Sequence, residues 1–244
     1  MLAVRDHRAD DYAALKDMDL TDVGILDDSD RACLREIGEY LTTADAWRRF
    51  AIWLLHKHFE PLAGEIFVER AMPRTGTTET TPMQRSDFAF DSLSASAIRF
   101  GDDIDTDLYL VGLEFSELSS FGDVAPLSAD DKAVLVGIAQ RLRSHGKIDR
   151  FGVKLIRNPL GLSEGQLLLE TCDPATRTQY CEIGSHEALP NDRSIIETTW
   201  RWQLTYGTSH PVVMQQCTAG CTPAAVEGHV LAHDQSGFNT DDEV

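Results

Sequence analysis

Residues 30–78 read DRACLREIGEYLTTADAWRRFAIWLLHKHFEPLAGEIFVERAMPRTGTT, and residues 131–179 read DKAVLVGIAQRLRSHGKIDRFGVKLIRNPLGLSEGQLLLETCDPATRTQ. The two stretches align without a gap when the sequence is shifted by 101 positions, and 13 aligned pairs are identical. About 3 identities are expected from average residue usage. Among the identical pairs are Leu34/Leu135, Ile37/Ile138, Arg49/Arg150, Phe50/Phe151, Gly64/Gly165, Glu69/Glu170 and Asp30/Asp131. A repeat of this length predicts that one structural unit occurs twice in tandem.

Each unit is predicted to begin with a helix. The first helix is expected over 29–43, capped by Asp28 or Ser29, with an apolar face that recurs every four residues. The second repeats this pattern with Ser128 as N-cap and Asp131 three residues on. About five antiparallel strands follow each helix, so the predicted fold is α+β, two tandem helix-plus-antiparallel-sheet units related by a pseudo-twofold axis. The strands are expected at 49–58, 65–71, 76–83, 93–101 and 107–116 in the first unit, and at 150–157, 166–171, 176–184, 194–204 and 211–217 in the second.

The domain boundaries follow from the repeat. We expect an N-terminal polar segment over 1–27, a first repeat over 28–120 and a second over 121–217. A C-terminal tail over 218–244 carries Cys and His, and its acidic end is expected to be disordered.

The first strand of each unit is apolar on both faces, which indicates a central position in a sheet. We expect this strand to form a hairpin with the next one. That arrangement would place Arg49 opposite Glu69 or Arg70, and Arg150 near Glu170, with charged cross-strand pairs formed by Arg49 with Glu69 and by Arg150 with Glu170.

Charge and cysteine content restrict the partners. The formal net charge of −18 argues against binding to a nucleic-acid backbone or to an anionic membrane surface. No apolar stretch is long enough to span a bilayer, and the first eleven residues do not resemble a signal peptide. Five cysteines, an odd number, favour thiols or metal ligands over a disulfide framework, so the expected compartment is the cytoplasm.

Differences between the two repeats are the best guide to chemistry, because groups needed for folding should occur in both. The first difference is His56-Lys57-His58, which aligns with Arg157-Asn158-Pro159. Residues two apart on a strand share a face, so both imidazoles would continue the row of Phe50, Ile52 and Leu54. They could act as a general acid and base or as two metal ligands, joined by Glu60 or Glu65. Two solvated histidines at a sheet rim are the alternative.

The second difference is Cys172 and Cys181. If Ala175–Thr178 forms the loop of a hairpin, these two cysteines lie directly opposite each other. They could then pack as small apolar groups, bind a metal or form a disulfide.

The third difference lies in the tail, where Cys217, Cys221, His229 and His233 have the spacing C-x3-C-x7-H-x3-H. Two thiolates and two imidazoles are the ligand set of a structural zinc site, although zinc fingers carry about 12 residues between the pairs. A polar tail with coincidental cysteines and histidines is the alternative.

These observations support two hypotheses for function. The preferred one is a non-catalytic metal-binding protein, with zinc held by Cys217, Cys221, His229 and His233. The alternative is a small-molecule enzyme in which His56 and His58 are catalytic, with or without a metal. The sequence contains no nucleotide-binding or hydrolase motif, and it identifies neither a substrate nor a protein partner.

Overall fold

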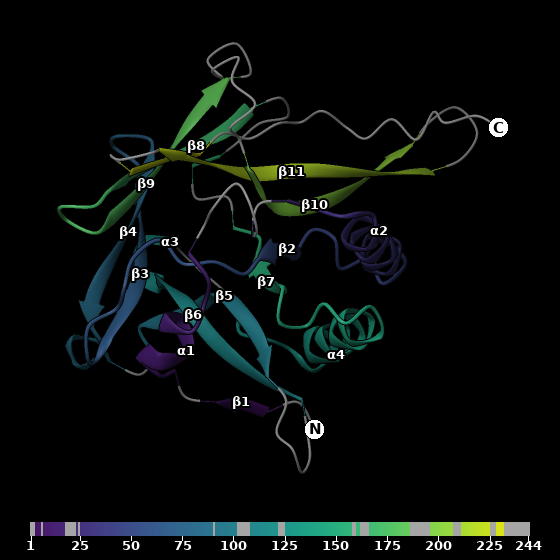
Figure 1. Ribbon diagram of the computed structural model, residues 1–244, viewed down its shortest axis with the longest axis horizontal. Coiled ribbons are helices and arrows are strands. Elements are labelled where there is room, and N and C mark those ends of the chain that lie inside the picture. Colours follow the sequence, from purple (N-terminus) through teal and green to yellow (C-terminus); the bar gives the residue numbers. More distant parts are fainter. Residues whose placement is uncertain are drawn as a thin grey trace.

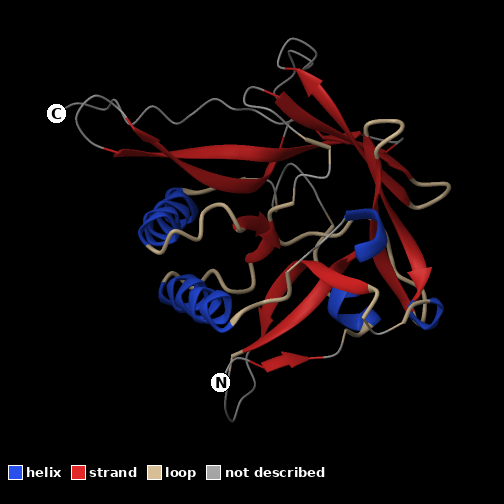
Figure 2. Ribbon diagram, turned by 180° about the vertical axis from the view of Figure 1, so that it is seen from behind, coloured by secondary structure: helices blue, strands red, loops and turns tan. Residues whose placement is uncertain are grey.

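A computed structural model defines the architecture of the chain (Figures 1 and 2). It describes residues 3–5, 7–17, 23, 25–89, 91–101, 108–121, 125–157, 160–161, 166–185, 196–206, 211–224 and 228–231. Within this part of the chain the fold is mixed α+β, with two long helices and three short helical turns beside one large sheet.

Helices α2 (Asp28–Thr43) and α4 (Ala129–Ser144) have the same length and the same type of N-terminus. Asp27, one residue before the expected cap, accepts a hydrogen bond from the backbone of Asp30 in a complete capping box. Ser128 and Asp131 form the capping box of α4, as predicted. Both helices lie side by side next to β2 and β7 (Figures 1 and 2). The short helical turns are α1 (Ala9–Ala13), α3 (Leu118–Phe121) and the 3-10 turn η1 (Arg85–Asp87).

The strands of both halves belong to one twelve-stranded sheet. They are β1 (Ala3–Arg5), β2 (Phe50–Leu54), β3 (Glu65–Met72), β4 (Thr77–Gln84), β5 (Leu93–Gly101), β6 (Tyr109–Glu117), β7 (Phe151–Leu155), β8 (Gln166–Asp173), β9 (Thr178–Ser185), β10 (Ile196–Tyr206), β11 (Pro211–Ala224) and β12 (Gly228–Leu231). The order is β1-β6-β3-β4-β9-β8-β12-β11-β10-β2-β7-β5, and an additional β5–β6 pairing closes the sheet on itself.

The two halves meet along the sheet at β4–β9, β10–β2, β2–β7 and β5–β7, all antiparallel. The predicted hairpin between the first two strands is wrong for both units. In the first unit β3 pairs with β4 and β6, and in the second unit β7 pairs with β2 and β5. The predicted pair of Arg49 with Glu69 is also wrong. Arg49 binds Asp131 of the other half, and Glu69 accepts a hydrogen bond from Ser116.

The apolar interior lies on both sides of β2, which is buried along its whole length as its sequence predicted. The larger cluster packs the helices on the sheet and includes Leu34, Ile37, Leu41, Phe50, Ile52, Leu135, Ile138, Leu142, Phe151, Val153, Trp200 and Trp202. The smaller cluster lies on the other side of β2 and includes Tyr12, Leu15, Trp53, Leu55, Phe67, Ala97, Val111 and Leu113. Since neighbouring residues of a strand face opposite sides, β2 serves both clusters.

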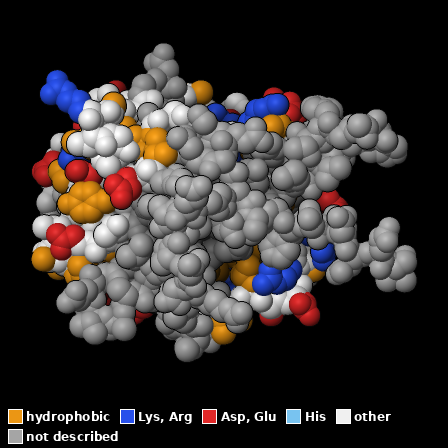
Figure 3. Space-filling view, turned by 90° about the horizontal axis from the view of Figure 1, so that it is seen from above, with side chains coloured by type: hydrophobic (Ala, Val, Ile, Leu, Met, Phe, Trp, Pro, Cys, Tyr) orange, Lys and Arg blue, Asp and Glu red, His pale blue; other side chains and the backbone are white. Residues whose placement is uncertain are grey.

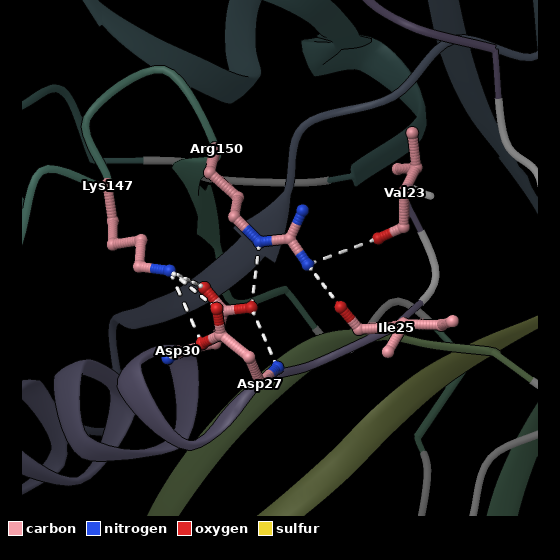
Figure 4. A network of polar contacts seen from close by, with 6 residues as sticks. All are labelled: Val23, Ile25, Asp27, Asp30, Lys147 and Arg150. Atoms are coloured by element: carbon pink, nitrogen blue, oxygen red, sulfur yellow. Dashed lines mark hydrogen bonds and ion pairs between the residues drawn. The ribbon is translucent and has the colours of Figure 1, made fainter. Parts of the chain in front are cut away.

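A polar network ties the second half to the first helix (Figure 4). Asp30 is 1 % exposed, and its carboxylate contacts Lys147 Nζ at 2.6 Å and Arg150 Nε at 3.0 Å. Arg150 also donates to the carbonyl oxygens of Ile25 at 2.6 Å and Val23 at 3.4 Å. Carboxylates that are this buried are normally paired, and here both partners come from the opposite half.

An equivalent network joins the first half to the second helix. Arg49 Nε lies 2.6 Å from Asp131 Oδ1. The Arg49 guanidinium also donates to the carbonyl oxygens of Ala125 at 3.1 Å and Pro126 at 3.2 Å. Each arginine therefore anchors the N-terminus of the other half's helix.

Acidic and basic side chains lie interspersed with apolar ones on the face seen in Figure 3. In the described part of the chain, no helix combines the length and the apolar content needed to cross a bilayer.

Candidate functional site

His56 and His58 come directly after β2, which ends at Leu54. The prediction that both imidazoles continue the row of Phe50, Ile52 and Leu54 is wrong, because the strand has already ended. His56 instead packs against Trp53, on the opposite side, with ring centroids 5.4 Å apart. The His56 side chain is 1 % exposed, and its Nδ1 lies 2.6 Å from the Leu54 carbonyl oxygen. The interpretation as solvated rim histidines is thus excluded for His56.

The β8–β9 hairpin approaches this segment from the second half. Its four-residue loop is 174–177, one residue earlier than predicted, so Cys172 lies opposite Gln179 and Cys181 lies opposite Glu170. Cys172 and Cys181 are therefore diagonal neighbours on the two strands and not directly opposite, which places their Cα atoms about 7–8 Å apart. That separation is too long for a disulfide.

The turn itself explains the shift in register. The Asp173 side chain accepts hydrogen bonds from the Ala175 amide at 2.9 Å and the Thr176 hydroxyl at 2.7 Å. Arg177 takes a left-handed conformation with φ of 52°, which closes the loop one residue early. An aspartate that binds the backbone two residues on is a known turn-forming device.

Four side chains converge where the hairpin meets the end of β2: His56, His58, Cys172 and Gln179, which we call the histidine site. His58 Nε2 lies 3.1 Å from His56 Nε2, and His58 Nδ1 lies 3.8 Å from Cys172 Sγ. The Gln179 amide nitrogen lies 3.4 Å from His58 Nε2, and an amide rotated by 180° would present its oxygen there. His56, Cys172 and Gln179 are buried, whereas His58 is partly exposed.

Hydrogen-bond chemistry orders the protons along this chain. The Leu54 carbonyl can only accept, so His56 Nδ1 carries a proton and its Nε2 accepts when the ring is neutral. His58 Nε2 must then donate to His56, which leaves His58 Nδ1 as the acceptor facing Cys172. The arrangement is a thiol next to a base whose ring is oriented by a second group.

The same geometry bears on metal binding. Metal ligands must face one point at about 2.0–2.3 Å, whereas His58 turns one nitrogen to His56 and the other to Cys172. Among the described residues, no group of three or more His, Cys, Asp or Glu side chains is placed to hold a metal ion. The two Nε2 atoms alone, at 3.1 Å, are close to the separation of about 3.3 Å that two imidazoles have on one tetrahedral ion.

The tail ligands predicted from the sequence are only partly described. Cys217 and Cys221 lie in β11, opposite Trp200 and Ile196, and His229 lies in β12 opposite Pro223. His233 lies outside the described residues. Four residues of extended strand span about 13 Å, whereas two sulfurs on one zinc are about 4 Å apart. A zinc ion shared by Cys217 and Cys221 would need β11 to bend between them.

The acidic residues expected to join the histidines have other partners. Glu60 pairs with Lys57, whose ammonium also donates to the Ala13 carbonyl at 3.1 Å. Glu65 pairs with Arg177 through both carboxylate oxygens, and this contact lowers the pKa of Glu65.

A second polar cluster occupies the equivalent end of β7, where Arg157 aligns with His56; we call it the arginine site. The Arg157 guanidinium donates to the Ser94 hydroxyl at 3.0 Å and to the Ala95 carbonyl at 3.3 Å. Burial lowers the pKa of Arg157, and Glu69 opposes this effect. Burial likewise raises the pKa of Glu69, against the pull of Lys154 and Arg157.

Sequence reasoning missed Gln179 and the pairing of Glu65 with Arg177. The Asp173-Pro174-Ala175-Thr176 segment carried the signal for Gln179, because an aspartate-initiated turn fixes which residues pair beyond it. The Glu65–Arg177 contact joins residues 112 positions apart, and no local pattern marks it.

Comparisons with protein-family models, with curated proteins and with solved structures found no match to this chain.

Proposed function

We propose that this protein is an internally duplicated α+β enzyme in which one thiol–imidazole site, Cys172 with His58 and His56, acts on a small molecule. The observation that carries the proposal is the directed hydrogen-bond chain from Cys172 through His58 to His56 and the Leu54 carbonyl. It develops the hypothesis that His56 and His58 are catalytic and adds the nucleophile.

Element bounds support the duplication. Helices α2 and α4, and the strand pairs β2/β7, β3/β8 and β4/β9, each begin and end 101 residues apart. The left-handed positions recur at the same interval, with Asp45 matching Gly146 and Gly76 matching Arg177.

Pairing between the halves supports a pseudo-twofold axis. Ile52 pairs with Val153, and Glu79 pairs with Tyr180; each of these residues thus lies opposite its own repeat equivalent. A two-fold interface has this property, because the same surface is used by both partners. The contacts of Arg49 with Asp131 and of Arg150 with Asp30 are reciprocal in the same sense.

Asymmetry supports the assignment of chemistry to one site. The equivalents of His56, Cys172 and Gln179 in the other half are Arg157, Ala71 and Thr78. None of these three can replace an imidazole or a thiol. The proposed duplication therefore leaves this thiol–imidazole set in one half, among the residues that the structure describes.

The proposed chemistry follows from the proton order. His58 Nδ1 takes the proton of the Cys172 thiol, and the thiolate attacks an electrophilic carbon of the substrate. A sulfur–carbon bond forms, the bond to the leaving group breaks, and the leaving group receives the proton from His58. His56 holds the His58 ring in the required tautomer, as the third member of a catalytic triad does. Such a thiol requires a reducing compartment, consistent with the cytoplasm.

The test is peptide-resolved alkylation by iodoacetamide across pH 5–10, read by mass spectrometry. Cys172 should react with a pH midpoint below that of an ordinary thiol, about 8.5, because the neighbouring imidazole stabilises the thiolate. The His58→Asn variant should move that midpoint upward. Cys33 is the internal control: it is fully buried, and burial raises the pKa of its thiol to about 12. A Cys172 profile that matches Cys33 would contradict the proposal.

A second candidate function is binding of zinc, and the 3.1 Å approach of the two imidazole Nε2 atoms favours it. Elemental analysis of protein purified without added metal tests this candidate. Loss of one zinc equivalent in a His56→Gln/His58→Gln double variant would place the metal at the histidines. Loss in a Cys217→Ser/Cys221→Ser variant would place it in the tail with His229 and His233. Metal-free wild-type protein would remove the candidate.

A further inference from the structure

Arg177 occupies a backbone position that ordinarily belongs to glycine. Its φ is 52°, and the equivalent residue of the first half, Gly76, has φ of 68°. A left-handed conformation costs a non-glycine residue about 1 kcal/mol or more. The two hairpin turns otherwise have the same length, 73–76 and 174–177, so the arginine is not required to form the loop.

The guanidinium of Arg177 binds two residues, Glu60 and Glu65, in the segment that follows the histidines. Its Nη1 and Nη2 lie 2.7 Å and 2.8 Å from the two carboxylate oxygens of Glu65, and Nη1 also donates to the Glu60 carbonyl at 3.0 Å. Glu65 is 8 % exposed and accepts a further hydrogen bond from the Leu62 amide at 2.7 Å. Two-pronged contacts of this kind fix orientation as well as distance.

The contact connects both sides of the histidine site. Arg177 lies in the turn, which the Asp173–Thr178 pair separates from the Cys172–Gln179 pair, and Glu60 lies two residues after His58. The hairpin and the histidine segment are therefore joined by the 3.8 Å contact of Cys172 with His58 and, beside it, by the Arg177 clamp. A displacement of the hairpin along the sheet would open the thiol–imidazole contact.

We infer that Arg177 is a positioning residue, which holds Cys172 against His58 by clamping the β8–β9 turn to Glu65 and the Glu60 carbonyl. This inference rests on the proposed function. It also gives a reason for the backbone strain, because the side chain at this position secures a contact that glycine could not make.

The decisive variant is Arg177→Gly, because fold and site respond to it differently. Glycine relieves the left-handed strain and restores the residue used at Gly76, but it leaves the buried Glu65 carboxylate without its partner, so the melting temperature should fall while the protein stays folded. Removal of the clamp should raise the pH midpoint of Cys172 alkylation and slow the reaction at pH 7 by about tenfold, the effect of one pKa unit. The matched control is Arg74→Gly, which removes an exposed arginine from the equivalent turn and should leave the Cys172 profile unchanged.

Two further variants separate positioning from charge. Glu65→Gln keeps the shape of the partner but not its charge, and it should reproduce the shifted midpoint. Arg177→Lys keeps the charge but cannot bind both carboxylate oxygens, so it should restore only part of the reactivity.

The outcomes distinguish this inference from the function on which it rests. If wild-type Cys172 shows no depressed midpoint, the thiol–imidazole enzyme itself is ruled out. If the wild-type midpoint is depressed and Arg177→Gly and Glu65→Gln leave it unchanged, the enzyme stands and Arg177 is only a turn residue. A shifted midpoint in both variants, measured on protein that remains folded at the assay temperature, supports the positioning role.

Discussion

The segments that follow β2 and β7 align in the sequence repeat, yet they carry different side chains. Beyond β2, His56 contacts His58, which in turn contacts Cys172. Beyond β7, Arg157 contacts Ser94 and interacts electrostatically with Glu69. A thiol and an imidazole can pass a proton between them, whereas an arginine stays protonated.

The proposed function separates the residues that join the two halves from the residues that act chemically. Reciprocal contacts such as Arg49 with Asp131 and Arg150 with Asp30 hold the halves together. Neither of these two arginine–aspartate contacts belongs to the histidine site. Substitutions in the framework should therefore change stability, and substitutions in the histidine site should change reactivity.

The largest effect is expected at Asp30. It is 1 % exposed and is paired with both Lys147 and Arg150, so Asp30→Ala removes the buried anion that these two cations share and leaves Lys147 only its 3.4 Å contact with Asp27. We expect a loss of about 3–5 kcal/mol in the free energy of unfolding, the cost of breaking a buried ion pair. The side chain of Asp131, which aligns with Asp30, is 12 % exposed. Asp131→Ala should therefore lower the free energy of unfolding by less, about 1 kcal/mol.

Urea denaturation measures both variants, and Asp130→Ala serves as an exposed control within about 0.5 kcal/mol of wild type. Equal losses at Asp30 and Asp131 would mean that the two networks are energetically equivalent despite their different burial.

The next effect concerns Glu69 at the arginine site. Burial raises the pKa of Glu69 in the folded protein, so the folded state binds its proton more tightly than the unfolded state does. Its contribution to stability is complete below the unfolded pKa of about 4.3 and is lost as the pH rises through the folded pKa. Glu69→Gln cannot ionise, so it should gain stability over wild type as the pH rises, by about 1 kcal/mol.

Denaturation of wild type and Glu69→Gln between pH 4 and pH 8 checks this expectation. Glu39→Gln, at an exposed position on α2, is the matched control for exchanging a carboxylate for an amide. A difference between wild type and Glu69→Gln that stays constant with pH would show that the Glu69 carboxyl titrates alike in the folded and unfolded states.

The smallest effect is expected where the helices end. Asp45 has φ of 52°, and its equivalent after α4 is Gly146 with φ of 66°. Asp45→Gly should stabilise by up to about 1 kcal/mol, because glycine adopts this conformation without strain. The exposed contact of Asp45 with Arg48 should offset little of this gain. The reverse change, Gly146→Asp, should destabilise by a similar amount in a thermal melt, and a loss of stability in both variants would contradict the strain argument.

Much of the secondary structure could be predicted from the sequence, because helix caps and apolar periodicity are local signals. Ser128 with Asp131 marked the start of α4, and the apolar run after Arg49 marked a buried strand. The partners of that strand could not be predicted. The pairing of β2 with β7 joins residues about a hundred positions apart, and nothing in either strand distinguishes that partner from a closer one.

The histidine site could be predicted in part. His56 and His58 stood out because Arg157 and Pro159 replace them in the other half. The place of Cys172 depended on the hairpin register, which the side chain of Asp173 decides. The hairpin loop was predicted one residue too late, and for this reason the predicted register did not place Gln179 opposite Cys172.

The most direct test is the protonation state of the two imidazoles, read from nitrogen-15 chemical shifts of labelled histidine, with His56→Gln and His58→Gln used for assignment. Above neutral pH, His56 should carry its proton on Nδ1 and His58 should carry its proton on Nε2, because the Leu54 carbonyl fixes the first ring and the first ring fixes the second. Protons on Nε2 of His56 and on Nδ1 of His58 would reverse the chain and leave the Cys172 thiol without a base.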